Sequence, residues 1–367
     1  FSRLLKMQCV LEISLKKIKS NWEKINKYSN FKASAVIKAN AYGFGSEEIA
    51  LALSQSGCNF FYVAQIEEGI KLRNLFKSDK IKIGVLEGML HHPREYSENN
   101  LIPVINSFNQ LNDFIEFKKI FPQIKSILHI DTGMNRLGLD ENELNLVLKN
   151  ISNISSVNFE FIMTHFSNSN VKNDNFNDAQ YKKILKINSY FKNKKITLSN
   201  TGGILLDKKF ILDQTRPGIG IYGYDANGKT ITLDNQKLNF PAKLKVPVLQ
   251  IRFGKKGDKV SYGRTETLIR DSKLITIGIG YADGILRLLK KNMKIIINGK
   301  SCQIIGSITM DSLIVDITDV ETKNLQVGSY LELINEDYLF NLNESCLGVS
   351  IYEMFTLISN RVIRKYV

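Results

Sequence analysis

The sequence predicts an α/β fold, with a region of alternating strands and helices followed by a smaller, mainly β region. Short apolar runs alternate with segments of helical spacing through about residue 235, and closely spaced β-rich runs replace them after residue 236. The length of 367 residues fits one large domain and a smaller partner. We therefore divide the chain into an N-terminal strand (1–13) expected to pack with the β domain, an alternating domain (14–235) and a C-terminal β domain (236–367).

Eight apolar runs are the strand candidates of the alternating domain. Their apolarity is continuous along each run, which is typical of strands covered on both faces, as in a parallel sheet. The runs are residues 35–37, 60–64, 81–86, 102–105, 126–131, 159–165, 195–199 and 219–223. Eight strands over about 220 residues have the size and rhythm of a (β/α)8 barrel. A doubly wound sheet gives a similar alternation, so the periodicity leaves both folds open.

Segments with helical spacing lie between these runs. An apolar residue recurs at every third or fourth position after Ser14, a good N-cap residue, and again after Ser107. The residues are Leu15, Ile18, Trp22, Ile25 and Tyr28 in the first segment and Phe108, Leu111, Phe114 and Ile115 in the second. We expect an amphipathic helix at each place.

The C-terminal region consists of apolar runs separated by Gly, Asp and Asn, which favour turns. The runs are residues 243–253, 273–284, 294–306, 312–318 and 329–335. Only residues 350–360, SIYEMFTLISN, have helical spacing here. The pattern predicts an antiparallel β domain with one helix near the end of the chain.

The composition argues against several classes of protein. Lys and Arg number 50 against 36 Asp and Glu, a net charge of +14. The lysines are spread along the whole chain without a basic arm or zinc-finger spacing, so we expect a solvated basic surface and no nucleic-acid binding. No apolar stretch approaches the roughly 18 residues of a membrane span, and no secretory signal is visible. Because the chain begins with Phe1, a few residues are expected to be missing upstream.

The four cysteines are far apart and form no CxxC pair. They are Cys9, Cys58, Cys302 and Cys346. Such spacing predicts neither a disulfide framework nor a zinc site, and it fits a reducing compartment. We expect a cytoplasmic protein without a metal ion.

The segment AVIKANAYGFG, residues 35–45, carries the clearest chemistry. Lys38 stands at the C-terminal end of a predicted buried strand, where barrel enzymes place their active sites. Desolvation there lowers the pKa of a lysine and makes its free amine available as a Schiff-base nucleophile. A lysine that merely extends into solvent from a strand end is the alternative, and this residue alone favours it.

The same segment resembles the pyridoxal-phosphate lysine motif of the alanine racemase family, AVVKANAYGHG. Six further motifs of that family follow in the same order, and together they span residues 35 to 366. They are DTGMNRLG at 131–138, THF at 164–166, RPGIGIYG at 216–223, GYADG at 280–284, ITMD at 308–311 and IYEMFTLISNRVIRKY at 351–366. The chain is identified as a member of this family, which implies a (β/α)8 barrel, a pyridoxal-phosphate cofactor, an amino-acid substrate and a homodimer with shared active sites.

The resemblance implies two catalytic bases. Lys38 is expected to hold the cofactor as a Schiff base and to exchange the Cα proton on one face of the substrate. Tyr281 is expected to act on the opposite face, from the other subunit. Tyrosine is a weak base and needs a cationic environment, to which His165 and Arg136 correspond. Without the resemblance, Tyr281 reads as an aromatic residue of a glycine-rich turn.

The family also implies the cofactor and substrate contacts. Arg216 corresponds to the partner of the pyridine nitrogen of the cofactor. Because arginine can only donate a hydrogen bond there, the nitrogen is expected to stay neutral. Reprotonation of the substrate carbanion is then favoured over transamination. A structural turn before Pro217 is the alternative for this residue. The remaining expected cofactor contacts are Tyr42, His165, Thr201, Gly218, Ile219 and Tyr352. The expected substrate-binding residues are Arg136, the backbone N–H of Met310 from the partner subunit, and Asp311 as a supporting residue.

Three positions depart from the family pattern. His129 stands where many members have a carbamylated lysine that orients the arginine corresponding to Arg136. Asn135 replaces a glycine, and Phe44 replaces a histidine near the cofactor loop. A histidine forms no stable carbamate, so Arg136 is expected to be oriented by Asn135 or by a bound chloride.

The resemblance implies an alanine racemase that interconverts L-alanine and D-alanine and supplies D-alanine for peptidoglycan. A broad-specificity amino-acid racemase, acting on serine or larger side chains, is an alternative. So is a non-catalytic pyridoxal-phosphate carrier, but the small single-barrel carriers lack a β domain to supply Tyr281 and Met310. A decarboxylase is disfavoured, since Arg216 stands where electron-sink chemistry requires an acidic partner.

Overall fold

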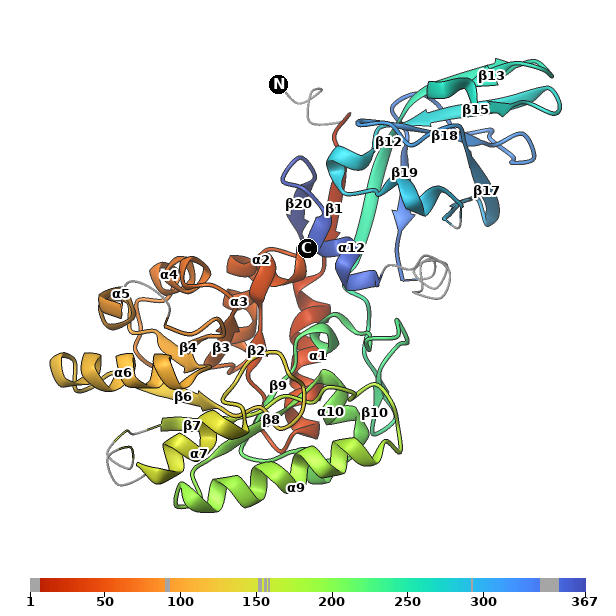
Figure 1. Ribbon diagram of the computed structural model, residues 1–367. Helices are drawn as coiled ribbons and strands as arrows, with labels where there is room; N and C mark the ends of the chain where they lie inside the picture. The colour runs from red at the N-terminus through yellow and green to blue at the C-terminus, as the bar shows by residue number, and fades with distance from the viewer. Residues whose placement is uncertain are drawn as a thin grey trace.

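The computed structural model describes residues 7–89, 93–150, 154, 157, 159–291, 293–336 and 350–367. Figure 1 shows a barrel in the lower half and a separate β domain above it, with the C-terminus at the junction between them. The prediction of a (β/α)8 barrel followed by a mainly β domain is confirmed.

The barrel is a sheet of eight parallel strands in sequential order. It closes because Ser34 N donates to Thr215 O at 2.9 Å and Val36 N donates to Pro217 O at 2.9 Å. This closure excludes the doubly wound alternative. The strands are β2 (Ala35–Val36), β3 (Phe60–Val63), β4 (Lys82–Val85), β5 (Ile102–Ile105), β6 (Ser126–His129), β7 (Phe159–Met163), β8 (Ile196–Asn200) and β9 (Gln214–Arg216).

The eighth strand is not the one that the apolar pattern predicts. Residues 219–223 were expected to form it, but they contain a 3-10 helix, η3 (Ile219–Tyr222), so that prediction is wrong. The strand is β9, whose three side chains are polar and fully buried. They are stable there because the interior supplies partners: Tyr62 Oη, for example, donates to Gln214 Oε1 at 2.7 Å. A search for apolar runs misses a strand of this kind.

Helices alternate with the strands and form the outer layer of the barrel (Figure 1). The two helices expected from their spacing are confirmed, with Ser14 Oγ accepting from Lys17 N at 3.4 Å and Ser107 Oγ accepting from Gln110 N at 3.2 Å. The helices are α1 (Leu15–Tyr28), α3 (Ser46–Gln55), α4 (Ile66–Leu75), α5 (Pro93–Glu98), α6 (Phe108–Ile120), α7 (Glu141–Lys149), α9 (Asn175–Tyr190), α10 (Thr201–Leu206) and the 3-10 helix η2 (Lys208–Phe210). The segment labelled α2 (Lys38–Tyr42) is a short left-handed turn at the end of β2.

The β domain includes strands from both ends of the chain. Strand β1 (Val10–Ile13) pairs antiparallel with β12 (Ala242–Gly254) and parallel with β20 (Ile363–Tyr366). The larger sheet is completed by β15 (Ser272–Ile277), β16 (Lys294–Ile297), β17 (Lys300–Ile305), β18 (Leu313–Asp316) and β19 (Tyr330–Ile334). A small hairpin, β13 (Lys259–Val260) with β14 (Glu266–Thr267), also belongs to this domain, whereas the hairpin of β10 (Thr232–Leu233) with β11 (Gln236–Lys237) packs against α1 of the barrel (Figure 1). The helices are η4 (Tyr262–Arg264), η5 (Tyr281–Asp283), η6 (Arg287–Lys291) and α12 (Ile351–Leu357).

The C-terminal segment fastens the β domain to the loop after β2. Arg364 Nε donates to Gly43 O at 2.7 Å, and Tyr366 Oη donates to Phe44 O at 3.1 Å. Gly43 also lies against α12, where a Cβ atom would stand 1.9 Å from Phe355 O. A side chain at this position would therefore collide with backbone.

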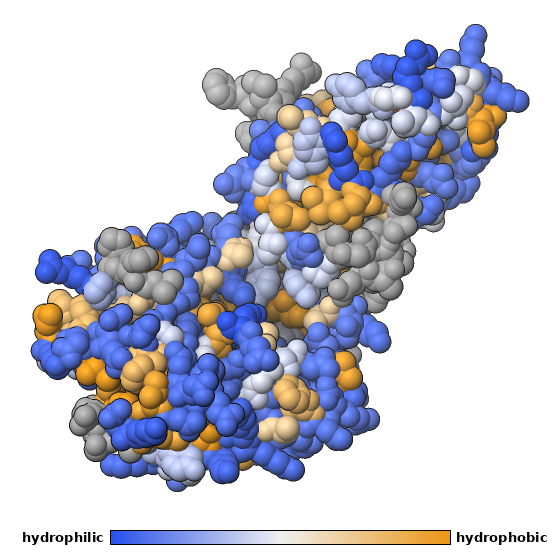
Figure 2. All heavy atoms as spheres, viewed as in Figure 1, coloured by the Kyte–Doolittle hydropathy of each residue, from blue (hydrophilic) through white to orange (hydrophobic). Residues whose placement is uncertain are grey.

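The surface carries both hydrophilic and hydrophobic areas. On the face that Figure 2 shows, most of the barrel surface is hydrophilic, and hydrophobic residues gather at the edge of the β domain toward the barrel. Within the described ranges, no helix has the length and apolarity to cross a membrane. Cys9, Cys58 and Cys302 are buried free thiols, and Cys346 lies outside the described residues.

The Gly43 contact gives a stability prediction. Gly43 has φ +87°, so Gly43→Ala combines left-handed strain with the Phe355 collision. We expect the free energy of unfolding to fall by about 2–4 kcal/mol, measured by chemical denaturation. Gly57→Ala is the matched control, because Gly57 has φ +97° with no atom within 4 Å of the added Cβ. Its loss should be about 1 kcal/mol from strain alone, and equal losses in the two variants would contradict the packing role of Gly43.

Candidate active site

The residues after Lys38 form a left-handed turn. Residues 39–42 have φ between 51° and 55°, a conformation that residues other than glycine rarely adopt. Each such residue costs roughly 1–2 kcal/mol, so the turn persists only because its surroundings hold it. Glu68 Oε1 accepts a hydrogen bond from Ala39 N at 2.6 Å and helps to do so. The turn fixes where the Lys38 side chain leaves the end of β2.

The electrostatics at Lys38 favour a neutral amine. Burial lowers the pKa of this amine, and the positive charge of Arg136 lowers it further, whereas the Glu68 carboxylate acts in the opposite direction. A lowered pKa raises the fraction of free amine at neutral pH, as a lysine that forms Schiff bases requires.

Arg216 is a buried cation held by neutral groups. Its side chain lies at the end of β9, and the residue is 3% exposed. Burial lowers the pKa of the guanidinium to about 10, which leaves it protonated at neutral pH. Its oxygen acceptors in the described part of the chain are Thr197 Oγ1 at 2.6 Å, Thr164 O at 2.8 Å and Leu198 O at 3.2 Å. The guanidinium therefore acts only as a donor here and has no acid to neutralise it.

His165 is a neutral imidazole beside this guanidinium. Arg216 Nη2 lies 3.2 Å from His165 Nδ1, and Asn200 Nδ2 lies 3.3 Å from His165 Nε2. An imidazolium would direct N–H groups at both of these donors. Burial, followed by the charges of Arg216 and Arg136, lowers the pKa of His165 well below its usual value. The ring is therefore a polar, uncharged part of the site.

His129 is also neutral, and its tautomer follows from its partner. His129 Nδ1 lies 2.8 Å from Asn106 Oδ1, while Asn106 Nδ2 donates to Leu86 O at 2.9 Å. Because the amide oxygen of Asn106 faces the ring, Nδ1 carries the proton. Burial is the main cause that lowers the pKa of His129 to about 3, and the nearby Arg216 charge adds to it. This histidine keeps one fixed neutral form over the physiological range.

Thr201 organises the loop that follows β9. Its Oγ1 accepts hydrogen bonds from Gly218 N at 3.2 Å and Gly220 N at 3.1 Å. A hydroxyl that accepts two hydrogen bonds still has its own proton to donate. Thr201 is thus placed as a donor beside a turn of backbone N–H groups.

Two tyrosines gather at the same loop. A Cβ atom at Gly218 would stand 2.3 Å from Tyr42 Oη, so only glycine fits beneath this hydroxyl. Burial raises the pKa of Tyr42, and the neighbouring Tyr352 on α12 raises it further, so the Tyr42 phenol is a protonated donor. Ile219 follows directly as the first residue of η3. These residues form one cluster of neutral hydrogen-bond donors.

Arg136 lies in an exposed loop after β6. Asp131 Oδ1 accepts from Gly133 N and Met134 N at 2.7 Å each, which fixes the start of the loop. Asn135 has φ 54°, and asparagine tolerates this left-handed conformation better than most residues. Asn135 therefore adopts a backbone conformation that a glycine would also allow.

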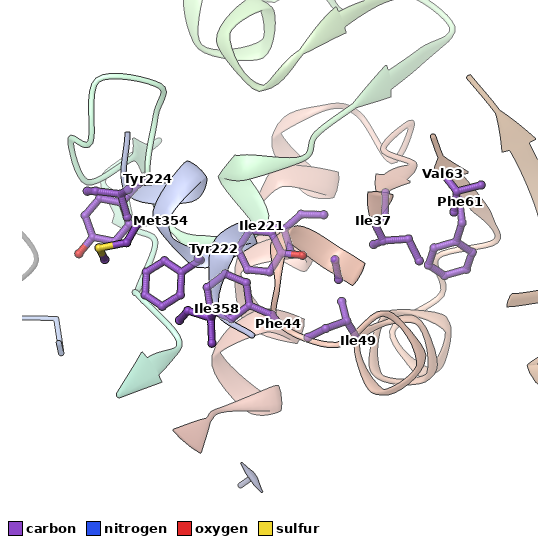
Figure 3. Packing of buried hydrophobic residues seen from close by; sticks show 14 of the residues in the cluster. Ile37, Phe44, Ile49, Phe61, Val63, Ile221, Tyr222, Tyr224, Met354 and Ile358 are labelled. Atoms are coloured by element: carbon purple, nitrogen blue, oxygen red, sulfur yellow. The ribbon is translucent and has the colours of Figure 1, made fainter. Parts of the chain in front are cut away.

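Phe44 fits the apolar packing behind the cofactor loop. Its ring stacks on Tyr222 at 4.4 Å between centroids and on Phe355 at 4.8 Å. Figure 3 shows Phe44 and Tyr222 within this buried cluster. The phenylalanine thus serves packing and carries no titratable group into the site.

Tyr281 and Met310 lie together on the β domain. Tyr281 N donates to Thr309 O at 3.1 Å, and the guanidinium carbon of Arg287 lies 4.6 Å from the Tyr281 ring centroid. Met310 is 51% exposed. Of the contacts found within the described ranges of one chain, none joins Tyr281 or Met310 to Lys38.

The structure thus divides the predicted site residues into two groups. On the barrel lie Lys38, Tyr42, Arg136, His165, Thr201, Arg216, Gly218 and Ile219, joined by Tyr352 of α12. Tyr281, Met310 and Asp311 lie on the β domain. Sequence reasoning missed Glu68, which holds the left-handed turn, and Asn106, which sets the His129 tautomer. Asn106 directly follows a predicted buried strand, and a polar residue in that place was the available signal.

The chain joins a barrel, which carries a lysine-centred polar cluster at its mouth, to a C-terminal β domain. These features define a class of two-domain barrel proteins. The sequence-family model of the alanine racemase N-terminal domain matches residues 13–226, and the family model of the C-terminal domain matches residues 242–366. The chain belongs to the alanine racemase family.

Individual relatives agree with this assignment. The chain is 34% identical to the alanine racemase of Rickettsia canadensis (strain McKiel), over 98% of this chain and 99% of that protein. It is 34% identical to that of Rickettsia bellii (strain RML369-C), over 92% of this chain and 82% of that protein. The crystal structure of alanine racemase from Bartonella henselae, with covalently bound pyridoxal phosphate, superposes with a TM-score of 0.90 at 33% identity, covering 98% of this chain and 99% of that one.

The neutral state of His129 gives a pH prediction. The folded pKa of about 3 lies below the unfolded value of about 6.5, so between these values the unfolded chain binds more protons at this residue. The free energy of unfolding therefore falls as the pH falls through this window. Compared with His129→Asn, the wild-type protein should lose about 2–3 kcal/mol more between pH 7 and pH 4.5. Denaturation at the two pH values measures this, and parallel losses would show that His129 is not held neutral.

Proposed function

We propose that this protein is a pyridoxal-phosphate-dependent alanine racemase that interconverts L-alanine and D-alanine. One observation carries the proposal: the Lys38 amine, with its lowered pKa, lies beside Arg136 and near the buried pair of Arg216 and His165. The names of the relatives and the cofactor of the Bartonella henselae protein support it. The product D-alanine would serve peptidoglycan synthesis, and we place the protein in the cytoplasm.

The residues present fit pyridoxal phosphate. Lys38 would supply the amine, and the hydroxyl groups of Tyr42, Thr201 and Tyr352 would supply a phosphate site, with the N–H groups of Gly218 and Ile219 beside them. The space above Gly218, which a Cβ atom would fill, lets backbone approach this site closely. When bound, the cofactor withdraws electrons from the substrate nitrogen and so acidifies the Cα–H bond.

Arg216 would hold the ring nitrogen of the cofactor. A guanidinium with a pKa of about 10 donates a hydrogen bond but does not give up its proton at neutral pH. With Arg216 as a donor only, the bound ring would stay uncharged and would withdraw fewer electrons than a protonated ring. Prompt return of the proton to Cα is favoured, as racemisation requires.

Two bases would exchange the proton. Lys38 receives or returns it on one face of Cα, and Tyr281 of the partner subunit does so on the other face. Arg136 and the backbone N–H of Met310, also from the partner, would bind the carboxylate of the amino acid. The arrangement requires a homodimer, because Tyr281 and Met310 project from the β domain without a described contact to Lys38 of their own chain.

The activity is tested with purified protein and each L-amino acid, by following the loss of optical activity. We expect alanine to lose it fastest, in a protein with a visible cofactor absorbance. Lys38→Ala should abolish both the absorbance that survives dialysis and the racemisation, because the covalent link is lost. Lys71→Ala is the control, since Lys71 is an exposed lysine whose ion pair within the described residues is with Glu47. Colour retained in Lys38→Ala would show that another lysine binds the cofactor.

The shared site is tested by mixing two inactive variants. Lys38→Ala and Tyr281→Phe should each lose at least a hundredfold in kcat. In a mixed dimer, one site combines the intact Lys38 of one subunit with the intact Tyr281 of the other. Refolding the two variants together in equal amounts should restore about a quarter of wild-type activity, since half of randomly formed dimers are mixed and each has one intact site. Activity that stays at the level of the separate variants would overturn the shared-site proposal.

A further inference from the structure

The two loops that carry Tyr281 and Met310 lie against each other, backbone to backbone. Tyr281 N donates to Thr309 O at 3.1 Å, and Ala282 N donates to Met310 O at 3.0 Å. The approach is so close that a Cβ atom at Gly280 would stand 2.3 Å from the carbonyl oxygens of both Thr309 and Met310. Movement of one loop therefore displaces the other.

One arginine from the C-terminal segment joins the two loops through their carboxylates. Arg361 Nε lies 3.3 Å from Asp283 Oδ1, and Arg361 Nη2 lies 2.8 Å from Asp311 Oδ1. Asp283 is itself fixed, because its side chain is only 7% exposed and its Oδ2 accepts from Gly280 N at 2.9 Å. Its backbone oxygen also accepts from Ser359 N at 3.2 Å, two residues before Arg361.

The chemistry of this bridge requires arginine. A planar guanidinium offers separate N–H groups to two carboxylates in a fixed geometry, whereas a lysine ammonium is a single point charge on a flexible chain. The Asp311 carboxylate is engaged in this ion pair and is 63% exposed. Its contact therefore points to a role in holding its loop.

We propose that Arg361 is a positioning residue that sets the Tyr281 phenol and the Met310 N–H for the active site of the partner subunit. The inference rests on the proposed function, because it assigns these two groups to that site. The Arg361–Asp311 pair is largely exposed, and exposed ion pairs contribute little to stability. The buried Asp283 carboxylate keeps its hydrogen bond from Gly280 N when Arg361 is replaced. The ion pairs of Arg361 therefore fix the position of the two loops more than they stabilise the fold of the domain.

The test compares Arg361→Gln with Arg270→Gln. Arg270 is the matched control, since it forms a similarly exposed ion pair with Asp319 on the same domain but lies outside the proposed site. We expect Arg361→Gln to lower kcat for alanine by about ten- to a hundredfold, the size of effect that misplaced catalytic groups produce. Its melting temperature and cofactor absorbance should stay close to those of Arg270→Gln. Asp311→Asn should lower kcat in the same direction, and Arg361→Lys should fall between Arg361→Gln and the wild type.

Isotope effects separate positioning from a general loss of structure. In the proposed two-base mechanism, we assign Tyr281 as the base that acts on L-alanine and Lys38 as the base that acts on D-alanine. With the Cα proton replaced by deuterium, L-alanine then reports proton removal by Tyr281, and D-alanine reports removal by Lys38. In Arg361→Gln, the isotope effect should rise for L-alanine and fall for D-alanine, because only the Tyr281 step becomes slower. Unchanged isotope effects, or a loss of activity that merely follows a lowered melting temperature, would overturn the inference.

Failure of this inference is distinguishable from failure of the proposed function. If the wild-type protein does not racemise alanine, the proposed function fails before any variant is compared. If the wild-type protein racemises alanine and Arg361→Gln matches Arg270→Gln in kcat and isotope effects, only the positioning role of Arg361 is overturned.

Discussion

The left-handed turn after Lys38 is the constraint on which the site depends. Four consecutive residues other than glycine adopt a conformation that each disfavours, so neighbouring structure must compensate. The compensation comes from two directions. Glu68 binds the start of the turn, and Arg364 binds the carbonyl of Gly43 at its end. The strained backbone thus depends both on a barrel helix and on the last strand of the β domain, and the two domains are needed together to place Lys38.

The electrostatics of the site follow from an excess of uncompensated basic groups. Lys38, Arg136 and Arg216 lie near each other. Glu68, the carboxylate that acts on Lys38, and Asp131, the one that acts on His129, both accept backbone N–H groups. Such an environment disfavours any further positive charge. It therefore keeps the nearby histidines neutral and favours ligands with negative groups, such as the phosphate and carboxylate of the proposed reaction.

The sequence predicted what depends on local pattern and missed what depends on tertiary partners. Seven barrel strands are continuous apolar runs and were recognised, whereas β9 is polar and could be recognised only with its interior partner Tyr62 known. The resemblance to the family assigned Arg216 and His165, but not that their side chains lie 3.2 Å apart. The sequence showed that His129 departs from the family pattern but not which tautomer it adopts. That tautomer is set by Asn106, which lies at the end of a neighbouring strand.

The C-terminal segment connects these results. Arg364 fastens it to the Lys38 loop of its own barrel, and Arg361, three residues earlier, fastens it to the loops of Tyr281 and Met310. In the proposed dimer these two attachments belong to different active sites, one to the site of this barrel and one to the site of the partner. The β domain therefore does more than supply two residues. Its C-terminal segment couples the Lys38 loop of one active site to the Tyr281 and Met310 loops that serve the active site of the partner subunit.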